Sequence, residues 1–140
     1  GILRPYDIIE PYRLEMGTKI SKILGSSLYD FWKEKITVKL NEEIINSKSL
    51  FLYNLASEEY YSAIDFGKLQ CKIINFDFKK LKNGKLSGIG MMIKRLRGEM
   101  ANYIISNKIS SLKKLEEFNA LSFKFSSFDK TSRKFLFISK

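Results

Sequence analysis

The sequence has 140 residues, 44% of them hydrophobic, with a net charge of +10 at pH 7, one cysteine and no histidine. This length predicts a single domain, residues 1–140. A single cysteine excludes an internal disulfide and favours the reducing cytoplasm. The sequence has no apolar run that would span a membrane and no leader typical of a secreted protein. The lack of histidine argues against a zinc site. We therefore expect a cytoplasmic protein with no metal and no cofactor.

The opening stretch, Leu3–Gly17, reads LRPYDIIEPYRLEMG. Pro5 and Pro11 each fix the backbone angle φ and remove an N–H donor, and each disfavours helix in the residue before it. The stretch is therefore predicted to be a kinked, extended loop that leads into a short strand, Tyr12–Met16.

The same stretch is dense in charge. Arg4 and Arg13 carry guanidinium groups suited to carboxylate or phosphate, and Asp7 and Glu15 lie within chain reach of both. Together with Tyr12, these residues form either a structural ion-pair network that holds a loop in place or the floor of a charged binding cleft. The residues alone leave both interpretations open.

Two helices and a strand are predicted next. Ser27 followed by Asp30 is typical of a helix N-terminus, and that helix runs to about Ser47. Its predicted buried face repeats every four residues: Leu28, Trp32, Ile36, Leu40 and Ile44. Residues 50–55 predict a buried strand, and Ser57 predicts a cap for a second helix that Gly67 ends.

A β-hairpin follows. Leu69–Phe78 alternates as a strand, and Asn83-Gly84 is a strong two-residue turn signal. The return strand is predicted from Leu86 to about Met91, where interior glycines indicate a bulge or a close backbone approach. Four lysines decorate the turn: Lys79, Lys80, Lys82 and Lys85.

A helix is predicted from Met92 to Asn107, with a buried stripe of Ile93, Leu96, Met100 and Ile104. Lys94, Arg97 and Gly98 lie on a different face. Glycine costs about 1 kcal/mol relative to alanine inside a helix, so Gly98 suggests that a packed strand or a ligand approaches the backbone there. A short helix at 112–118 and a terminal β-hairpin complete an α+β fold: a mixed sheet with β-hairpins packed by three to four helices.

Charge is distributed unevenly along the chain. Residues 1–77 hold 10 Lys and Arg against 11 Asp and Glu, whereas residues 78–140 hold 15 against 4. Such a cluster of cations predicts a polyanionic partner for one face, although a lysine-rich genome would give a similar composition.

Double-stranded DNA is the partner that these features favour. The chain has no catalytic triad or phosphate-binding glycine loop, and no known base-reading module. We expect contacts to the DNA backbone from a cleft and its rim, supported by a network of cleft residues. The cleft contacts are Arg4, Arg13, Lys94 and Arg97, the rim contacts are Lys79, Lys80, Lys82 and Lys85, and the network is Asp7, Tyr12, Glu15 and Gly98.

Two alternatives remain. The first is an enzyme acting on a small anionic or nucleotide substrate, because a carboxylate beside an arginine is also how a catalytic acid is placed. Its active-site residues would be Arg4, Asp7, Tyr12, Arg13 and Glu15, with Lys94. The chain could also be a structural half that completes a larger fold.

Five stretches resemble the YaaA peroxide-stress family, in the same order: LRPYDIIEPYRLEMG, LYDFWKEKITVKLN, NLASEEYY, KNGK and KRLRGEMANYIISNKI. The likeness runs from residue 1 to about Asn119. It implies a protein that binds DNA through a positively charged cleft and responds to hydrogen peroxide by limiting free intracellular iron. Members of this family carry a sizeable N-terminal half before the first motif, so the chain is expected to be the C-terminal portion.

Overall fold

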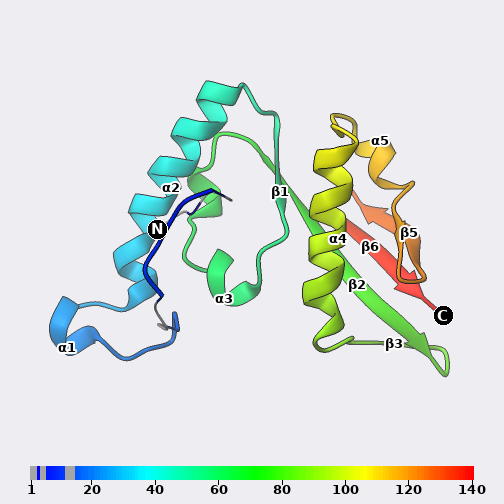
Figure 1. The fold of residues 1–140 in the computed structure, drawn as a ribbon, viewed down its shortest axis with the longest axis horizontal. Coiled ribbons are helices and arrows are strands. Elements are labelled where there is room, and N and C mark those ends of the chain that lie inside the picture. The colour runs from blue at the N-terminus through cyan, green and yellow to red at the C-terminus, as the bar shows by residue number, and fades with distance from the viewer. Residues whose placement is uncertain (1–2, 4–5, 12–14) are drawn as a thin grey trace. The chain divides into compact units, whose positions relative to one another are not determined.

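The computed structural model describes residue 3, residues 6–11 and residues 15–140 (Figure 1). The chain forms two compact units. The first comprises Gly1–Leu52 and Ala56–Lys72, and the second comprises Tyr53–Leu55 and Ile73–Lys140. The prediction of a single domain stays a prediction.

The opening segment of the first unit is irregular where it is described. Residue 3 and residues 6–11 belong to no helix or strand and are exposed, in agreement with the predicted loop. Of the predicted strand Tyr12–Met16, Glu15 and Met16 are not in a strand, and the other three residues lie outside the described part of the chain. Met16 donates its backbone N–H to Glu59 Oε1 at 3.4 Å.

A one-turn helix, α1 (Ser21–Leu24), precedes the long helix α2 (Leu28–Ser47). The predicted cap of α2 is confirmed, because Ser27 Oγ accepts the backbone N–H of Asp30 at 3.1 Å. The helix ends at Lys48, whose φ of 52° is left-handed and whose N–H binds the carbonyls of Ile44 and Ile45. Such a left-handed residue satisfies carbonyls that the helix itself leaves without partners.

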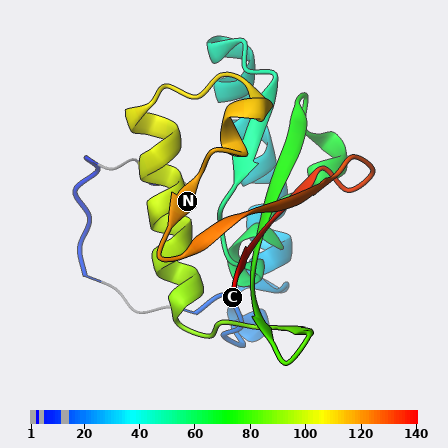
Figure 2. The same ribbon diagram turned by 90° about the vertical axis from the view of Figure 1, so that its right-hand side faces the viewer.

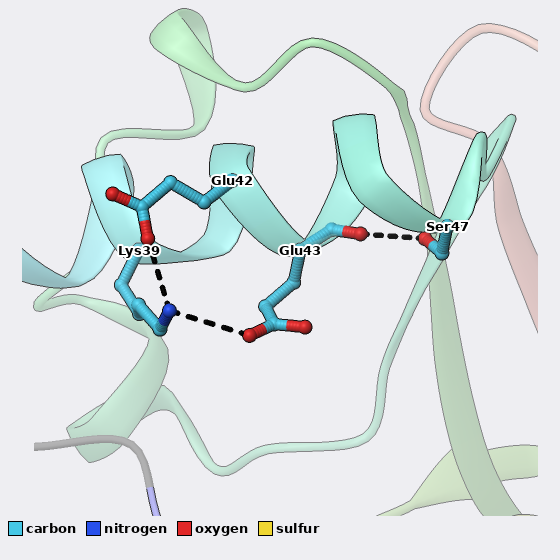
Figure 3. Close-up of polar contacts among 4 residues, drawn as sticks. All are labelled: Lys39, Glu42, Glu43 and Ser47. Carbon is cyan, nitrogen blue, oxygen red and sulfur yellow. Dashed lines mark hydrogen bonds and ion pairs between the residues drawn. The ribbon is translucent and has the colours of Figure 1, made fainter.

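The exposed side of α2 is held by local ion pairs (Figure 3). Lys39 Nζ lies 2.9 Å from Glu42 Oε2 and 3.4 Å from Glu43 Oε1. The hydrogen bond to Glu42, followed by that to Glu43, raises the pKa of Lys39 above its usual range. Ser47 Oγ donates to the carbonyl of Glu43 at 2.6 Å, one turn back. All these contacts are within α2 and stabilise the helix rather than form a site.

The helix predicted after Ser57 is shorter than expected. It forms only one turn, α3 (Glu58–Tyr61), and Ser57 makes no side-chain cap bond. Gly67 does not end it but lies inside a separate 3-10 turn, Phe66–Lys68. Side chains of α2 replace the helical hydrogen bonds here, since Thr37 Oγ1 accepts the N–H of Asp65 at 3.0 Å and Asn41 binds the carbonyl of Lys68 at 2.8 Å.

Replacing Thr37 with valine should destabilise the first unit. Thr37 is 3% exposed, and its hydroxyl also donates to the carbonyl of Lys33 at 2.6 Å. Valine keeps the shape but leaves the N–H of Asp65 without its acceptor, which costs about 1–3 kcal/mol when the group is buried. Urea unfolding followed by Trp32 fluorescence measures the loss, and Thr37→Ser, which keeps the hydroxyl, serves as the control. Equal stability of the valine and serine variants would contradict the assignment.

Most of the second unit's core is a mixed sheet, which has six strands in the described part of the chain and includes the first residues of β1 and β2 from the first unit (Figures 1 and 2). The order is β1-β2-β6-β5-β4, with β3 paired to β2. β2 runs parallel to β6, whereas the pairs β2–β3, β4–β5 and β5–β6 are antiparallel. The strands are β1 (Phe51–Asn54), β2 (Lys72–Lys82), β3 (Lys85–Ser87), β4 (Asn119–Ala120), β5 (Phe123–Asp129) and β6 (Lys134–Ser139).

Both predicted hairpins are confirmed, but one strand differs from its prediction. The return strand β3 ends at Ser87, so Gly88 and Gly90 follow the strand and mark no bulge within it. Gly90 has a φ of 54°, a left-handed conformation that glycine adopts readily and that turns the chain towards the next helix. β1 is half-buried rather than buried.

The helices α4 (Met92–Ser106) and α5 (Leu112–Leu115) cover one face of this sheet. Leu96 and Met100 of α4 are fully buried. Phe118, which follows α5, lies 5.3 Å from the ring of Phe137 in β6 and 5.5 Å from Tyr103 in α4. The core is thus an aromatic layer between helices and strands, and the predicted α+β class with a mixed sheet is confirmed.

Candidate nucleic-acid interface

The net charge of the protein resides in the second unit. The first unit carries 10 Lys and Arg and 10 Asp and Glu, whereas the second carries 15 and 5. The first unit is therefore formally neutral and the second accounts for the entire charge of +10. Because the units are compact bodies and not merely stretches of sequence, the excess of cations belongs to one of the two bodies.

The β2–β3 hairpin places its lysines on two different faces. Asn83 and Gly84 both have positive φ, 50° and 74°, which is the type I′ turn that the Asn-Gly pair favours. The register pairs Lys82 with Lys85, and paired residues in an antiparallel ladder share a face. Strand alternation places Lys82 and Lys80 on the side of buried Phe78, the side covered by the helices.

Lys79 points to the other face of the sheet. Its Nζ lies 3.6 Å from Asp77 Oδ1, so its charge is partly neutralised. Of the four predicted rim lysines, the structure thus brings together Lys80, Lys82 and Lys85 and separates Lys79 from them. The alternation of residues along the strand already separates Lys79 from Lys80 and Lys82, although the four lysines were predicted as one rim.

Helix α4 adds two of the predicted cations. Lys94 is exposed and Arg97 is half-exposed, and both lie in the first two turns. Figures 1 and 2 show the hairpin and the start of α4 at the same end of the second unit, joined by a short connection. We name this region the basic end: Lys80, Lys82, Lys85, Lys94 and Arg97.

Cations of the basic end have no acidic partners in the described part of the chain. No carboxylate lies within 4.0 Å of any of the five, whereas Arg95 on the same helix pairs with Glu99 at 3.8 Å. Unpaired, exposed cations retain their charge for an external anion. This is the arrangement expected of a surface that neutralises phosphates.

Gly98 does not have the close neighbour that the sequence suggested. A Cβ built on Gly98 would meet no described atom within 4 Å, and the residue is exposed. The packed strand offered as one explanation is therefore wrong. The other explanation, a ligand approaching the helix here, stays a prediction.

The site residues predicted in the opening stretch lie in the first unit or outside the described part of the chain. Arg4, Tyr12 and Arg13 lie outside the described residues. Asp7 and Glu15 are exposed and belong to the first unit. The predicted cleft that combines these arginines with Lys94 and Arg97 therefore stays a prediction, as does the rival enzymatic cluster.

Other chemistries find little support among the described residues. They contain no group of three or more Asp, Glu, Cys or His side chains placed to hold a metal ion. No helix in the described ranges is long and apolar enough to cross a bilayer. Cys71 is half-buried, and burial raises the pKa of its thiol, which disfavours the nucleophilic thiolate.

Comparison with known proteins identifies the family. The model of the peroxide stress protein YaaA matches residues 1–128. A UPF0246 protein of Shewanella baltica is 47% identical over 126 residues, which cover 90% of this chain and 49% of that protein. A UPF0246 protein of Crocosphaera subtropica is 43% identical over 138 residues, covering 99% and 55%. The chain spans about half the length of these curated relatives, and it belongs to the YaaA family of peroxide stress proteins.

Proposed function

We propose that the second unit binds duplex DNA through the basic end, as part of the cellular response to hydrogen peroxide. Contacts are made to the phosphate backbone, with Lys80, Lys82 and Lys85 from the hairpin and Lys94 and Arg97 from α4. Binding of this kind releases condensed counterions, so it depends steeply on salt and little on base sequence.

One observation supports this proposal above the others: the division of charge between the two units. A lysine-rich composition that reflected the genome alone would enrich both units in cations. Instead the first unit has equal numbers of acids and bases, and the second has a threefold excess of bases, 15 against 5. Selective enrichment of one compact body favours a polyanionic partner for that body.

The double variant Lys94→Glu/Arg97→Glu tests the proposal. Each phosphate contact contributes about 0.9 to the slope of log affinity against log salt. We expect the variant to bind every duplex more weakly, with a slope shallower by about 2. Gel-shift titrations at several salt concentrations, on two duplexes of unrelated sequence, measure both quantities.

A matched control separates local contact from overall charge. Lys22→Glu/Lys33→Glu makes the same change in net charge on exposed residues of the first unit. We expect it to leave the slope nearly unchanged. Equal weakening by both double variants would show that the basic end has no special role, and a flat salt response of the parent protein would overturn electrostatic DNA binding altogether.

The wider role is proposed from the family, since the chain spans about half the length of its curated relatives. The family resemblance implies cytoplasmic action that limits intracellular free iron and so protects DNA under peroxide stress. DNA binding by the basic end would place the protein beside the molecule that iron and peroxide damage. The described residues contain no group of three or more Asp, Glu, Cys or His side chains placed to hold an iron ion.

A further inference from the structure

A hollow of about 600 Å³ lies on the face of the sheet that α4 and α5 leave uncovered. Phe137 in β6 is buried beneath these helices, so its neighbour Ile138 points to the opposite face. Lys124 in β5 is paired with Ile138 across the ladder and shares that face. Leu81, which also lines the hollow, alternates with Lys82 along β2. The hollow is therefore separate from the basic end.

The floor of the hollow is apolar. It is formed by Leu81, which is 36% exposed, and by Ile138, which is half-buried. A concave hydrocarbon surface gains free energy when an apolar group covers it. The volume of the hollow falls within the range of about 300–1,000 Å³ that is typical of small-molecule sites in proteins. The shape and the floor together suit a small ligand with an apolar body.

Two lysines, Lys124 and Lys140, also line the hollow. Both are exposed, and no carboxylate in the described part of the chain lies within 4.0 Å of either. Lys79 on the same face differs, because Asp77 lies 3.6 Å from its amino group. Cations that the fold leaves unpaired beside an apolar floor are complementary to the charge of an anionic ligand.

Two serine hydroxyls on the edge of the hollow add hydrogen-bond donors. Ser122 belongs to the two-residue turn between β4 and β5, where Leu121 and Ser122 both have positive φ, 50° and 68°. Ser126 is the extra residue of a bulge in β5, where the register shifts between Phe125 and Ser127. Bulges and left-handed residues other than glycine are costly and are enriched at binding sites.

We infer that this hollow binds a small organic anion with an apolar body. The body lies on Leu81 and Ile138, and the anionic group lies towards Lys124 and Lys140, where Ser122 and Ser126 can donate hydrogen bonds to it. The hollow shares no residue with the basic end, so the inference goes beyond the proposed function and does not depend on it.

Anilinonaphthalene sulfonate is a suitable probe, because it joins an aromatic body to a single negative charge and fluoresces in apolar surroundings. We expect the folded parent protein to bind it saturably. Octanoate should displace the probe, and octanol, its uncharged counterpart, should be about tenfold less effective because it lacks the attraction to the lysines. Fluorescence titrations at one fixed salt concentration measure both affinities.

Two variants locate the bound probe. Lys124→Glu should weaken probe binding about tenfold, because repulsion replaces attraction. Leu81→Ser should weaken it about threefold, because part of the apolar floor is lost. The matched control is Lys113→Glu, which makes the same change in charge at an exposed position of α5 and should leave the affinity unchanged. Circular dichroism establishes that each variant is folded.

Three results would overturn the inference. The first is a folded parent protein that shows no saturable binding of the probe. The second is equal weakening by Lys124→Glu and Lys113→Glu, which would place the probe elsewhere on the molecule. The third is octanol that competes as well as octanoate, which would mean that the hollow does not select an anion. Should Leu81→Ser disturb the hairpin, the two glutamate variants still decide, since both positions are exposed.

Discussion

Replacing Phe78 with alanine is expected to lower the free energy of unfolding of the second unit by about 3–5 kcal/mol. Phe78 is 1% exposed at the centre of β2. Its ring stacks on Phe137 at 5.5 Å and meets the edges of Phe118 and Phe123, each at 6.3 Å. Alanine would leave a cavity among three large aromatic rings, which cannot collapse into it without breaking their own contacts.

Urea unfolding followed by circular dichroism measures this effect, because the second unit contains the sheet. Leu86→Ala is the control, since it removes a side chain of the same hairpin that is 49% exposed. We expect it to change the free energy of unfolding by no more than about 0.5 kcal/mol. A comparable loss in both variants would contradict the placement of Phe78 at the centre of the core.

Local signals in the sequence predicted the elements of the fold well. The Ser27–Asp30 pair placed the start of α2, and Asn83-Gly84 placed the first hairpin, because each is a property of a few consecutive residues. The alternation of Phe135 and Phe137 likewise reports a buried face, whereas in the four-residue repeat of α2 only Leu28 and Ile44 are buried and the three residues between them are half-buried. Such features depend on the neighbours along the chain and hardly on the rest of the fold.

Predictions that depended on distant partners were less successful. The helix after Ser57 is cut to one turn because Thr37 and Asn41, on another helix, take over backbone groups around Asp65 and Lys68. The strand after Gly84 ends at Ser87, because the chain then turns through Gly90, whose φ is positive, to begin α4. The parallel pairing of β2 with β6 joins residues nearly sixty positions apart, and no local pattern specifies it.

The candidate site was predicted in composition but not in arrangement. The cluster of cations between Lys79 and Arg97 is visible in the sequence. Its division into Lys80, Lys82 and Lys85 on one face and an ion-paired Lys79 on the other depends on strand register and on which side the helices cover.

Hydrogen peroxide should oxidise the methionines at the start of α4 while sparing the methionine inside the same helix. Met91 is 88% exposed and Met92 is 48% exposed, whereas Met100 is 0% exposed. Peroxide transfers one oxygen to the thioether sulfur, which becomes a sulfoxide, and is itself reduced to water. The sulfur must be reached by solvent, so Met100 can react only when α4 opens from the sheet.

Trypsin separates the two kinds of methionine, because cleavage after Lys85, Lys94, Arg97 and Lys108 puts Met91 and Met92 in peptide 86–94 and Met100 in peptide 98–108. Mass spectrometry after a short peroxide treatment should therefore find the added oxygen on the first peptide alone. In urea all three residues should react alike, since free methionines have the same chemistry. Oxidation of Met100 in the folded protein at the rate of Met91 would mean that α4 does not pack on the sheet through its Leu96–Met100 stripe. The assignments of the core and of the basic end would then both be wrong, because that packing also determines the side of the sheet on which Lys94 and Arg97 lie.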